Sequence, residues 1–389
     1  MQRRFKLLYL TPGCFDKGGI SRYCRYQIRA WREILGEESV AVFSLRGPDS
    51  RSFEDPFPVH FHADGVGARS KANLIARFGE AALRSSPEVI HSAHVNMSGL
   101  AHGTARALRR PSILNVYGLE VWSGMRADAA WGLQRSNHVI ADCHFTARYL
   151  GEHSLRTAPA HVIWDCVELA RFSPGSPDAQ ALARYGIPDP GAHLNLMTLG
   201  RLSEAARHKG YERLLAVFKL VHAEIPRSRL VICGEGDFQA ALQRMAIEHG
   251  ISELVHFTGA IRERDLPDVY RAAHVFSLVS DRGPGRGEGV PLTPLEAAAC
   301  GVPIIVGDQD GSAEAVEDSV TGFVVNPFEL REHASRIVGL ARAPAMLRSM
   351  GAAARARIEE HFSYSVFLRK HHSFLEQHLP SILANRRSS

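Results

Sequence analysis

The feature that most constrains this chain is a regular alternation of short apolar runs with longer segments of helical period. Between most of the apolar runs, apolar residues recur at helical spacing, as they do from Ile20 to Leu35. Strands that alternate with helices predict a parallel sheet with helices on its faces, which is a doubly wound α/β fold. The strands expected in the first half are residues 7–11, 40–45, 88–93, 112–117, 138–143 and 161–164.

The alternation stops in the middle of the chain and then resumes. Residues 168–193 are rich in proline, glycine and polar residues, which is typical of a linker between domains. After Asn326 only helical patterns remain, and 389 residues are many for one hydrophobic core. We therefore predict two α/β domains that face one another across a cleft. The strands expected in the second half are residues 194–199, 229–234, 254–259, 274–279, 302–307 and 322–325.

Composition excludes several classes of protein. Apolar residues make up 45% of the chain and charged residues 22%, which is ordinary for a soluble globular protein. No apolar run approaches the length of a membrane span, and the run after the first residues is too short for a signal peptide. The six cysteines have no paired spacing, so reduced buried thiols are favoured over disulfides or zinc. We expect a cytoplasmic protein.

The net charge of +5 is concentrated in the first half of the chain. Residues 1–180 hold 22 Lys and Arg against 17 Asp and Glu, whereas residues 181–389 hold 24 of each kind. No nucleic-acid-binding motif accompanies the excess. It suits a domain that meets phosphate-bearing substrates or the anionic inner face of a membrane, although solvated surface charge explains it as well. The cations Arg69, Lys71 and Arg77 lie together in a helical segment of this half.

Loops that follow the expected strands carry the candidate binding residues, because open α/β sheets bind ligands outside the carboxyl ends of their strands. Gly18 and Gly19 precede a helix whose N-terminus favours a phosphate, and a simple tight turn is the alternative. The pair is not a dinucleotide-binding fingerprint. Arg201 and Lys209 follow residues 194–199 and could hold a diphosphate, or else be solvated loop charges.

Two glutamates stand out in GEGVPLTPLEAAACGVPIIVGDQDG, residues 287–311. Glu288 lies in a glycine-rich loop ahead of a helix expected to start near Pro291 or Leu292, and the amides of Gly289 and Val290 are exposed to a ligand there. Glu296 falls in the second turn of that helix among residues that look buried, so a ribose diol is a better partner for it than the helix dipole.

Asp308 and Asp310 raise the alternative of a D-x-D metal site for a nucleotide diphosphate. A turn with Asx-type caps is the simpler interpretation, because the pair follows a strand and precedes Gly-Ser. With two cations available nearby, a metal is not required.

In this order the loops resemble the retaining glycosyltransferases of family 4, whose GT-B architecture has two Rossmann-like domains. The resemblance covers nearly the whole chain, and its most specific part is the E-x7-E motif from Glu288 to Glu296. The further matches are KGGIS near the start, YGLEVW, VIWDCVELARFSP, GRLSEAARHKG, GEGDF and GSAEAVEDSVTGFVVNP.

The resemblance implies domains at 1–172, for the acceptor, and 173–361, for the nucleotide sugar, with a helix in 362–389 that crosses back to the first domain. It implies a hexosyltransferase that uses a UDP- or GDP-sugar, as in polysaccharide biosynthesis, with a glycan, lipid-linked or small-molecule acceptor. The reaction would be a metal-independent, front-face displacement without a cofactor, and nucleic acid is not expected as a partner.

The resemblance also assigns roles to single residues. Glu288 would contact the transferred sugar and Glu296 the donor ribose, while Arg201 and Lys209 would neutralise the leaving diphosphate. The remaining residues assigned to substrate binding are Gly18, Gly19, Tyr117, Glu120, Ile261, Gly289 and Val290.

Departures from the family pattern leave alternatives open. Tyr117 stands where the family often has His, which can alter the choice of donor. The gap from Arg201 to Lys209 is longer than usual, so Arg207 or His208 could supply the second cation. The competing functions are a nucleotide-sugar-binding subunit without turnover and a GT-B sugar-nucleotide epimerase.

Overall fold

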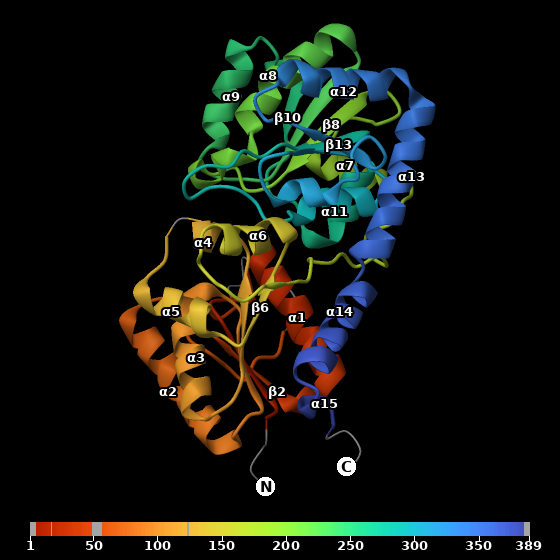
Figure 1. Cartoon of the computed structure of the whole chain (residues 1–389). Coiled ribbons are helices and arrows are strands. Elements are labelled where there is room, and N and C mark those ends of the chain that lie inside the picture. The colour runs from red at the N-terminus through yellow and green to blue at the C-terminus, as the bar shows by residue number, and fades with distance from the viewer. Residues whose placement is uncertain (1–4, 17, 49–56, 123, 385–389) are drawn as a thin grey trace. The chain divides into compact units, whose positions relative to one another are not determined.

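The computed structural model describes residues 5–16, 18–48, 57–122 and 124–384 and divides the chain into two compact units (Figure 1). The first unit joins the residues up to Cys166 to the segment from Tyr364 onward, and the second runs from Val167 to Ser363. Each unit contains one parallel sheet flanked by helices, so the predicted pair of doubly wound α/β domains is confirmed. Lys17, the first residue of KGGIS, lies outside the described residues.

The sheet of the first unit has seven parallel strands in the order β3-β2-β1-β4-β5-β6-β7. The order of the strands reverses at β1, which pairs with both β2 and β4. Only β3, at one edge, was not predicted, because its two residues are partly exposed and form no apolar run. The strands are β1 (Leu7–Thr11), β2 (Val40–Ser44), β3 (Phe61–His62), β4 (Val89–Ser92), β5 (Ser112–Val116), β6 (His138–Ala141) and β7 (His161–Val162).

Helices bury both faces of this sheet, which is why β1, β2, β4 and β5 are buried at every position. In β1, Leu7 and Tyr9 belong to one hydrophobic cluster, whereas Leu8 and Leu10 belong to another. The helices that precede the second unit are α1 (Gly19–Leu35), α2 (Ala68–Ser85), α3 (Ser98–Ala107), α4 (Leu119–Trp122), α5 (Ala127–Arg135) and α6 (His144–Glu152), with 3-10 turns at Glu37–Ser39 and Val95–Met97.

The C-terminal helices α14 (Tyr364–His378) and α15 (Ser381–Ala384) are part of this first unit. Figure 1 shows α14, in blue, beside α1, in red, and these two helices are in contact. Phe367 and Phe374 enter the same hydrophobic cluster as α1. Buried His371 is hydrogen-bonded to the Nε2 atom of Gln27 at 3.0 Å, so polar as well as apolar contacts hold α14 on α1.

The sheet of the second unit has six parallel strands in the order β10-β9-β8-β11-β12-β13. The order of its strands reverses at β8, which pairs with both β9 and β11. In such a sheet ligands bind at the carboxyl ends of the strands, where the strand order reverses. The strands are β8 (Leu194–Leu199), β9 (Ser228–Cys233), β10 (Val255–Phe257), β11 (Val275–Leu278), β12 (Ile304–Gly307) and β13 (Gly322–Val325).

The helices of the second unit account for the remaining helical patterns. They are α7 (Ala179–Tyr185), α8 (Tyr211–Glu224), α9 (Gln239–Glu248), α10 (Leu266–Arg271), α11 (Leu292–Ala299), α12 (Leu330–Arg342) and α13 (Pro344–His361), with 3-10 turns at Glu204–Lys209, Ser252–Leu254, Glu263–Asp265 and Gly311–Ala315. Figure 1 shows α12 beside α8, and the two helices are in contact.

Residues 168–193 belong to the second unit and are not a linker. They contain α7, whose N-cap Asp178 accepts a hydrogen bond from the backbone N of Gln180 and whose C-cap Gly186 has a φ of +63°. Asp178 and Gly186 of this segment therefore cap a short helix. The two units divide at Cys166/Val167 and Ser363/Tyr364, close to the expected 172/173 and 361/362.

All six cysteines are free and buried, as predicted. In the described residues no helix is both long and apolar enough to cross a lipid bilayer.

Candidate active site

The loops that follow β8 and β11 lie side by side in the second unit, because β8 and β11 are neighbours and run in parallel. The backbone N of Asp281 donates a 2.8 Å hydrogen bond to the carbonyl oxygen of His208. Gly210, with a φ of +79°, begins α8, and a Cβ there would lie 2.5 Å from the carbonyl oxygen of Val279. Only glycine lets the first loop pass this close to the second.

These two loops bring Lys209 and Glu288 together. The Oε1 atom of Glu288 accepts hydrogen bonds from Lys209 Nζ at 2.7 Å and from His208 Nε2 at 2.6 Å. The three side chains are largely buried, with 14% of Lys209, 18% of Glu288 and 8% of His208 exposed. Burial opposes ionisation of Glu288, but Lys209 and His208 outweigh it and lower the pKa of the carboxyl to about 2.

The backbone around Glu288 is held by the loop that follows β12. The backbone N of Glu288 donates to the Oδ2 atom of Asp310 at 2.9 Å, and its carbonyl oxygen accepts from the backbone N of Gly311 at 3.0 Å. Asp310 also accepts from the backbone N of Ser312 and from the hydroxyl of Ser280. Its oxygens thus bind loop donors as the cap of a turn, while Asp308 is exposed.

The cations of the β8 loop have different surroundings. Arg201 is exposed and makes no hydrogen bond or ion pair with the described residues. Arg207 forms ion pairs on the surface with Glu204 and Glu212 and not with Glu288. His208, the other suggested substitute for Lys209, binds the same carboxylate as Lys209. The structure therefore groups His208 and Lys209 together and separates Arg207 from them.

Glu296 occupies the second turn of α11, which starts at Leu292 as expected. The side chain is 2% exposed, and its Oε2 atom accepts a 2.6 Å hydrogen bond from the hydroxyl of Tyr270 on α10. This partner was not foreseen, because Tyr270 lies 26 residues before Glu296 in the sequence.

The other predicted residues of the second unit lie in loops after strands. Gly289 is partly buried and Val290 is buried, and both precede the first residue of α11. Ile261 is partly buried in the loop that follows β10. No hydrogen bond of the described residues joins Ile261 to Glu288 or Lys209, so its role depends on the ligand.

In the first unit, Gly18 is the N-cap of α1 and Gly19 its first residue. Both are exposed, and a Cβ at either position would meet nothing within 4 Å. Gly18 has a φ of −68°, which any residue adopts. The fold therefore does not require glycine at these two positions, which weakens the alternative of a simple tight turn.

Tyr117 and Glu120 lie after the carboxyl end of β5. The Tyr117 hydroxyl is buried and accepts a 3.0 Å hydrogen bond from Asn115, and the Tyr117 backbone N donates to Glu120 Oε1 at 2.6 Å. Burial raises the pKa of Glu120 to about 7, although the amide of Tyr117 partly opposes the shift. The buried Glu120 Oε2 atom has no hydrogen-bond partner among the described residues.

Sequence reasoning missed two groups, one in each unit. His94 follows β4 and its ring lies 6.4 Å from that of Tyr117, and burial lowers the pKa of its imidazole to about 4. Asp281, only 4% exposed at its side chain, is ion-paired with Arg213 and Arg286 beside the Glu288 loop. Their positions directly after strands β4 and β11 are the signal that could have singled them out.

Two family models match this chain, one for each sheet. The model described as Glycosyltransferase Family 4 matches residues 17–171, and the model described as Glycosyl transferases group 1 matches residues 195–357.

Sequence relatives include two groups of named enzymes. The chain is 31% identical over 258 residues to a GDP-mannose-dependent alpha-(1-6)-phosphatidylinositol monomannoside mannosyltransferase of Mycolicibacterium smegmatis, covering 64% of this chain and 66% of that protein. It is 31% identical over 205 residues to a D-inositol 3-phosphate glycosyltransferase of Streptomyces scabiei, covering 51% of this chain and 44% of that protein. The matches thus span from somewhat under half to about two thirds of these relatives' lengths.

Solved structures share the fold of the whole chain. Anabaena HepE in complex with UDP superposes with a TM-score of 0.79 at 16% identity, covering 96% of this chain and 100% of that one. Sucrose-phosphate synthase from Thermosynechococcus elongatus superposes with a TM-score of 0.73 at 21% identity, covering 97% of this chain and 100% of that one. The GT-B architecture expected from the sequence is thereby confirmed.

Proposed function

Because this chain belongs to glycosyltransferase family 4 and has its GT-B fold, we propose that it is a retaining hexosyltransferase that uses a nucleotide-diphosphate sugar. The observation that carries the proposal is the largely buried group formed by Lys209, His208 and Glu288. This group lies where the strand order of the second sheet reverses. A fixed ammonium in a largely buried setting is suited to stabilise a diphosphate as it leaves.

The chemistry requires one bond to break and one to form at the anomeric carbon. The bond to the diphosphate breaks through an oxocarbenium-like state, and the acceptor hydroxyl forms the new bond on the same face while the departing phosphate oxygen takes its proton. Negative charge therefore grows on the diphosphate, where Lys209 and Arg201 would balance it. Lys209 has three N–H donors, so it can keep its bond to Glu288 and still donate to a phosphate.

The other assigned residues would hold the donor and the sugar. Glu296, whose carboxylate is held by the Tyr270 hydroxyl, would accept a hydrogen bond from a ribose hydroxyl of the donor. Gly18, Gly19, Gly289 and Val290 would offer backbone amides to phosphate. Glu120 Oε2 is buried without a described partner, which suits a hydroxyl of the sugar or acceptor.

The relatives' names suggest the substrates to test first. The Mycolicibacterium relative is named for GDP-mannose and phosphatidylinositol monomannoside, and the Streptomyces relative is named for D-inositol 3-phosphate. We assign acceptor binding to the first unit, which carries the surplus of basic residues. GDP-mannose, followed by UDP-sugars, and inositol-containing lipid or soluble acceptors form the starting panel.

The experiment measures nucleotide release and product formation with that panel. A hexosyltransferase releases the nucleotide diphosphate in proportion to acceptor consumed and gives a glycoside with the donor's anomeric configuration, read by NMR coupling constants. Inversion of that configuration would overturn the retaining assignment. Binding without release would indicate a partner subunit, and conversion of the nucleotide sugar without acceptor would indicate an epimerase.

A further inference from the structure

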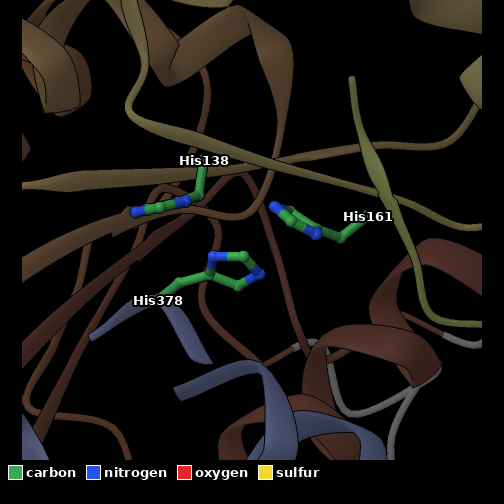
Figure 2. A group of neighbouring side chains, drawn as sticks. All are labelled: His138, His161 and His378. Atoms are coloured by element: carbon green, nitrogen blue, oxygen red, sulfur yellow. The ribbon is translucent and has the colours of Figure 1, made fainter. Parts of the chain in front are cut away.

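Three histidines of the first unit converge outside the candidate active site. His138 is the first residue of β6, His161 is the first residue of β7, and His378 is the last residue of α14. Figure 2 shows the three rings gathered around one space between the two strands and the end of the helix. We call His138, His161 and His378 the histidine cluster.

The spacing of the cluster is close to that of a metal site. One ring nitrogen from each histidine can be chosen so that all three lie within 4.8 Å of one another. Three imidazole nitrogens bound to one Zn²⁺ at about 2.0–2.1 Å lie roughly 3.3 Å apart. The three side chains are partly buried, and binding of an ion requires them to rotate by this difference.

The histidines of the cluster lack the partners that other histidines of the first unit have. Buried His91 is hydrogen-bonded to Trp31 and Asn115, and buried His371 to Gln27. In the described part of the chain, no protein group is hydrogen-bonded to the ring nitrogens of His138, His161 or His378. Their nitrogens are therefore available to an ion.

One apolar side chain supports all three rings. The ring of Phe374 lies 5.6 Å from that of His138, 5.1 Å from that of His161 and 5.2 Å from that of His378. A cavity of about 510 Å³ lined by His161 and His378 adjoins the cluster and gives room for an ion and a water molecule. The cluster is thus backed by an aromatic ring on one side and open on another.

The type of ligand set selects the metal. Three neutral nitrogen donors and no carboxylate suit Zn²⁺, Ni²⁺ or Co²⁺ and do not suit Mg²⁺ or Ca²⁺, which prefer oxygen ligands. Lys370 and Arg369 line the adjoining cavity, and their positive charges disfavour a cation. Affinity must therefore come from the imidazoles alone, and we expect moderate rather than very tight binding.

We propose that the histidine cluster binds one Zn²⁺ ion, with water in the fourth position, and that the ion fastens α14 to the edge of the first sheet. The ligands lie at the N-terminal ends of β6 and β7, whereas Tyr117 and Glu120 follow the carboxyl end of β5. The ion is therefore structural and takes no part in glycosyl transfer. It joins residues far apart in the sequence, so it stabilises the packing of the C-terminal helix.

The test uses the full chain without an affinity tag, stripped of metal by a chelator and dialysed. Isothermal titration with ZnCl₂ is expected to give one ion per chain, and CoCl₂ is expected to give the visible absorption of tetrahedral Co²⁺. The double variant His161→Asn with His378→Asn should bind Zn²⁺ at least about 100-fold more weakly. His153→Asn is the matched control, because His153 is exposed in the same unit and outside the cluster.

Thermal unfolding separates loss of the site from loss of the fold. Added Zn²⁺ should raise the unfolding midpoint of the wild type and of His153→Asn, and it should leave that of the double variant unchanged. The metal-free midpoints of the three proteins should agree within a few degrees. Absence of saturable Zn²⁺ binding to the wild type, or equal binding by the double variant, would overturn the proposal.

Discussion

At the scale of single residues, Glu288 is the most constrained side chain of the candidate active site. Its carboxylate accepts two charge-assisted hydrogen bonds while its backbone N is bonded to Asp310. A carboxylate held so firmly serves as a fixed negative charge that positions Lys209 and His208. This arrangement gives Glu288 a role in organising the cations as well as any contact with the sugar.

The lowered pKa of Glu288 predicts how stability changes in acid. The folded pKa of about 2 lies below the ordinary 4.5, so the ionised carboxyl stabilises the fold above about pH 4.5, and this contribution disappears as the pH falls toward 2. Glu288→Gln lacks the contribution at every pH. We expect its free energy of unfolding, measured in urea from pH 3 to pH 6, to vary less with pH than that of the wild type.

A control variant isolates this effect from general acid sensitivity. Glu248→Gln removes an exposed carboxylate without an ion pair among the described residues, so it should keep the wild-type slope. Equal slopes for Glu288→Gln and the wild type would show that Glu288 is not held ionised by Lys209 and His208.

The two cations assigned to the leaving group should affect turnover more than donor binding. Charge grows on the diphosphate only during the reaction, so Arg201→Ala and Lys209→Ala each should lower kcat by roughly 10²- to 10³-fold and change donor Kd far less. The measurement is steady-state kinetics combined with calorimetry of the nucleotide sugar. Arg207→Ala is the control from the same loop and should keep near-wild-type kcat, because Arg207 is paired on the surface. Near-wild-type turnover in both variants would refute the assignment.

Glu296 gives a separate prediction about nucleotide affinity. Replacing it by Gln keeps the shape and removes the charge, and charged hydrogen bonds are typically worth about 1.5–3 kcal/mol, so nucleotide Kd should rise by roughly 10- to 150-fold. Tyr270→Phe removes the intramolecular partner and keeps the carboxylate, so its affinity should change little. Calorimetry with a folded Glu296→Gln variant that binds nucleotide normally would remove Glu296 from the site.

At the scale of secondary-structure elements, α2 is the helix through which we propose that the chain meets an anionic membrane. Its exposed surface carries the basic residues Arg69, Lys71 and Arg77 together with two exposed apolar side chains, Ile75 and Leu83, which are 50% and 74% exposed. Basic and apolar groups on one helix are typical of peripheral membrane contacts. The apolar exposure was not part of the sequence argument and strengthens it.

Vesicle binding should therefore depend on α2 and on salt. Exposed cations contribute about 1 kcal/mol each at an anionic surface, so changing Arg69, Lys71 and Arg77 to Ser should weaken co-sedimentation with anionic vesicles by roughly 100-fold at low salt. High salt should weaken the wild type in the same direction. The measurement compares anionic with neutral vesicles at both salt concentrations.

The matched control changes three exposed arginines of the second unit, Arg244, Arg331 and Arg348, to Ser. It removes the same charge and should leave vesicle binding near that of the wild type. Binding that is insensitive to salt and to the α2 changes, or that is lost in the control, would contradict a membrane contact through α2.

At the scale of the whole molecule, a metal could affect either glycosyl transfer or thermal stability, and chelation distinguishes the two. Asp310 is buried and accepts hydrogen bonds from loop donors, and Asp308 is exposed, so this pair is not arranged as a metal site. We expect that chelation leaves glycosyl transfer unchanged when it is assayed well below the unfolding temperature. The histidine cluster predicts that the same treatment lowers the unfolding midpoint. Loss of transfer that Mn²⁺ or Mg²⁺ restores would revive the Asp308 and Asp310 alternative.

The sequence alone determined the elements and their grouping into two sheets. The spacing of apolar residues along the sequence reflects local backbone geometry. Strands such as 194–199 and the start of α11 near Leu292 could therefore be placed from it. Glu288 and Lys209 could likewise be singled out, because ligand-binding loops follow strand ends in this fold class. The capped helix at Ala179–Tyr185 was missed because the proline and glycine residues on either side of it made the segment resemble a linker.

Only the tertiary structure decided which side chains meet. The order of strands brings the β8 and β11 loops together and so gives Glu288 two partners, His208 and Lys209, from a loop about 80 residues earlier. The packing of α10 on α11 brings Tyr270 to Glu296, and α14 brings His378 beside His138 and His161. Such contacts depend on the packing of distant elements, because local propensity fixes the path of each element and not its neighbours.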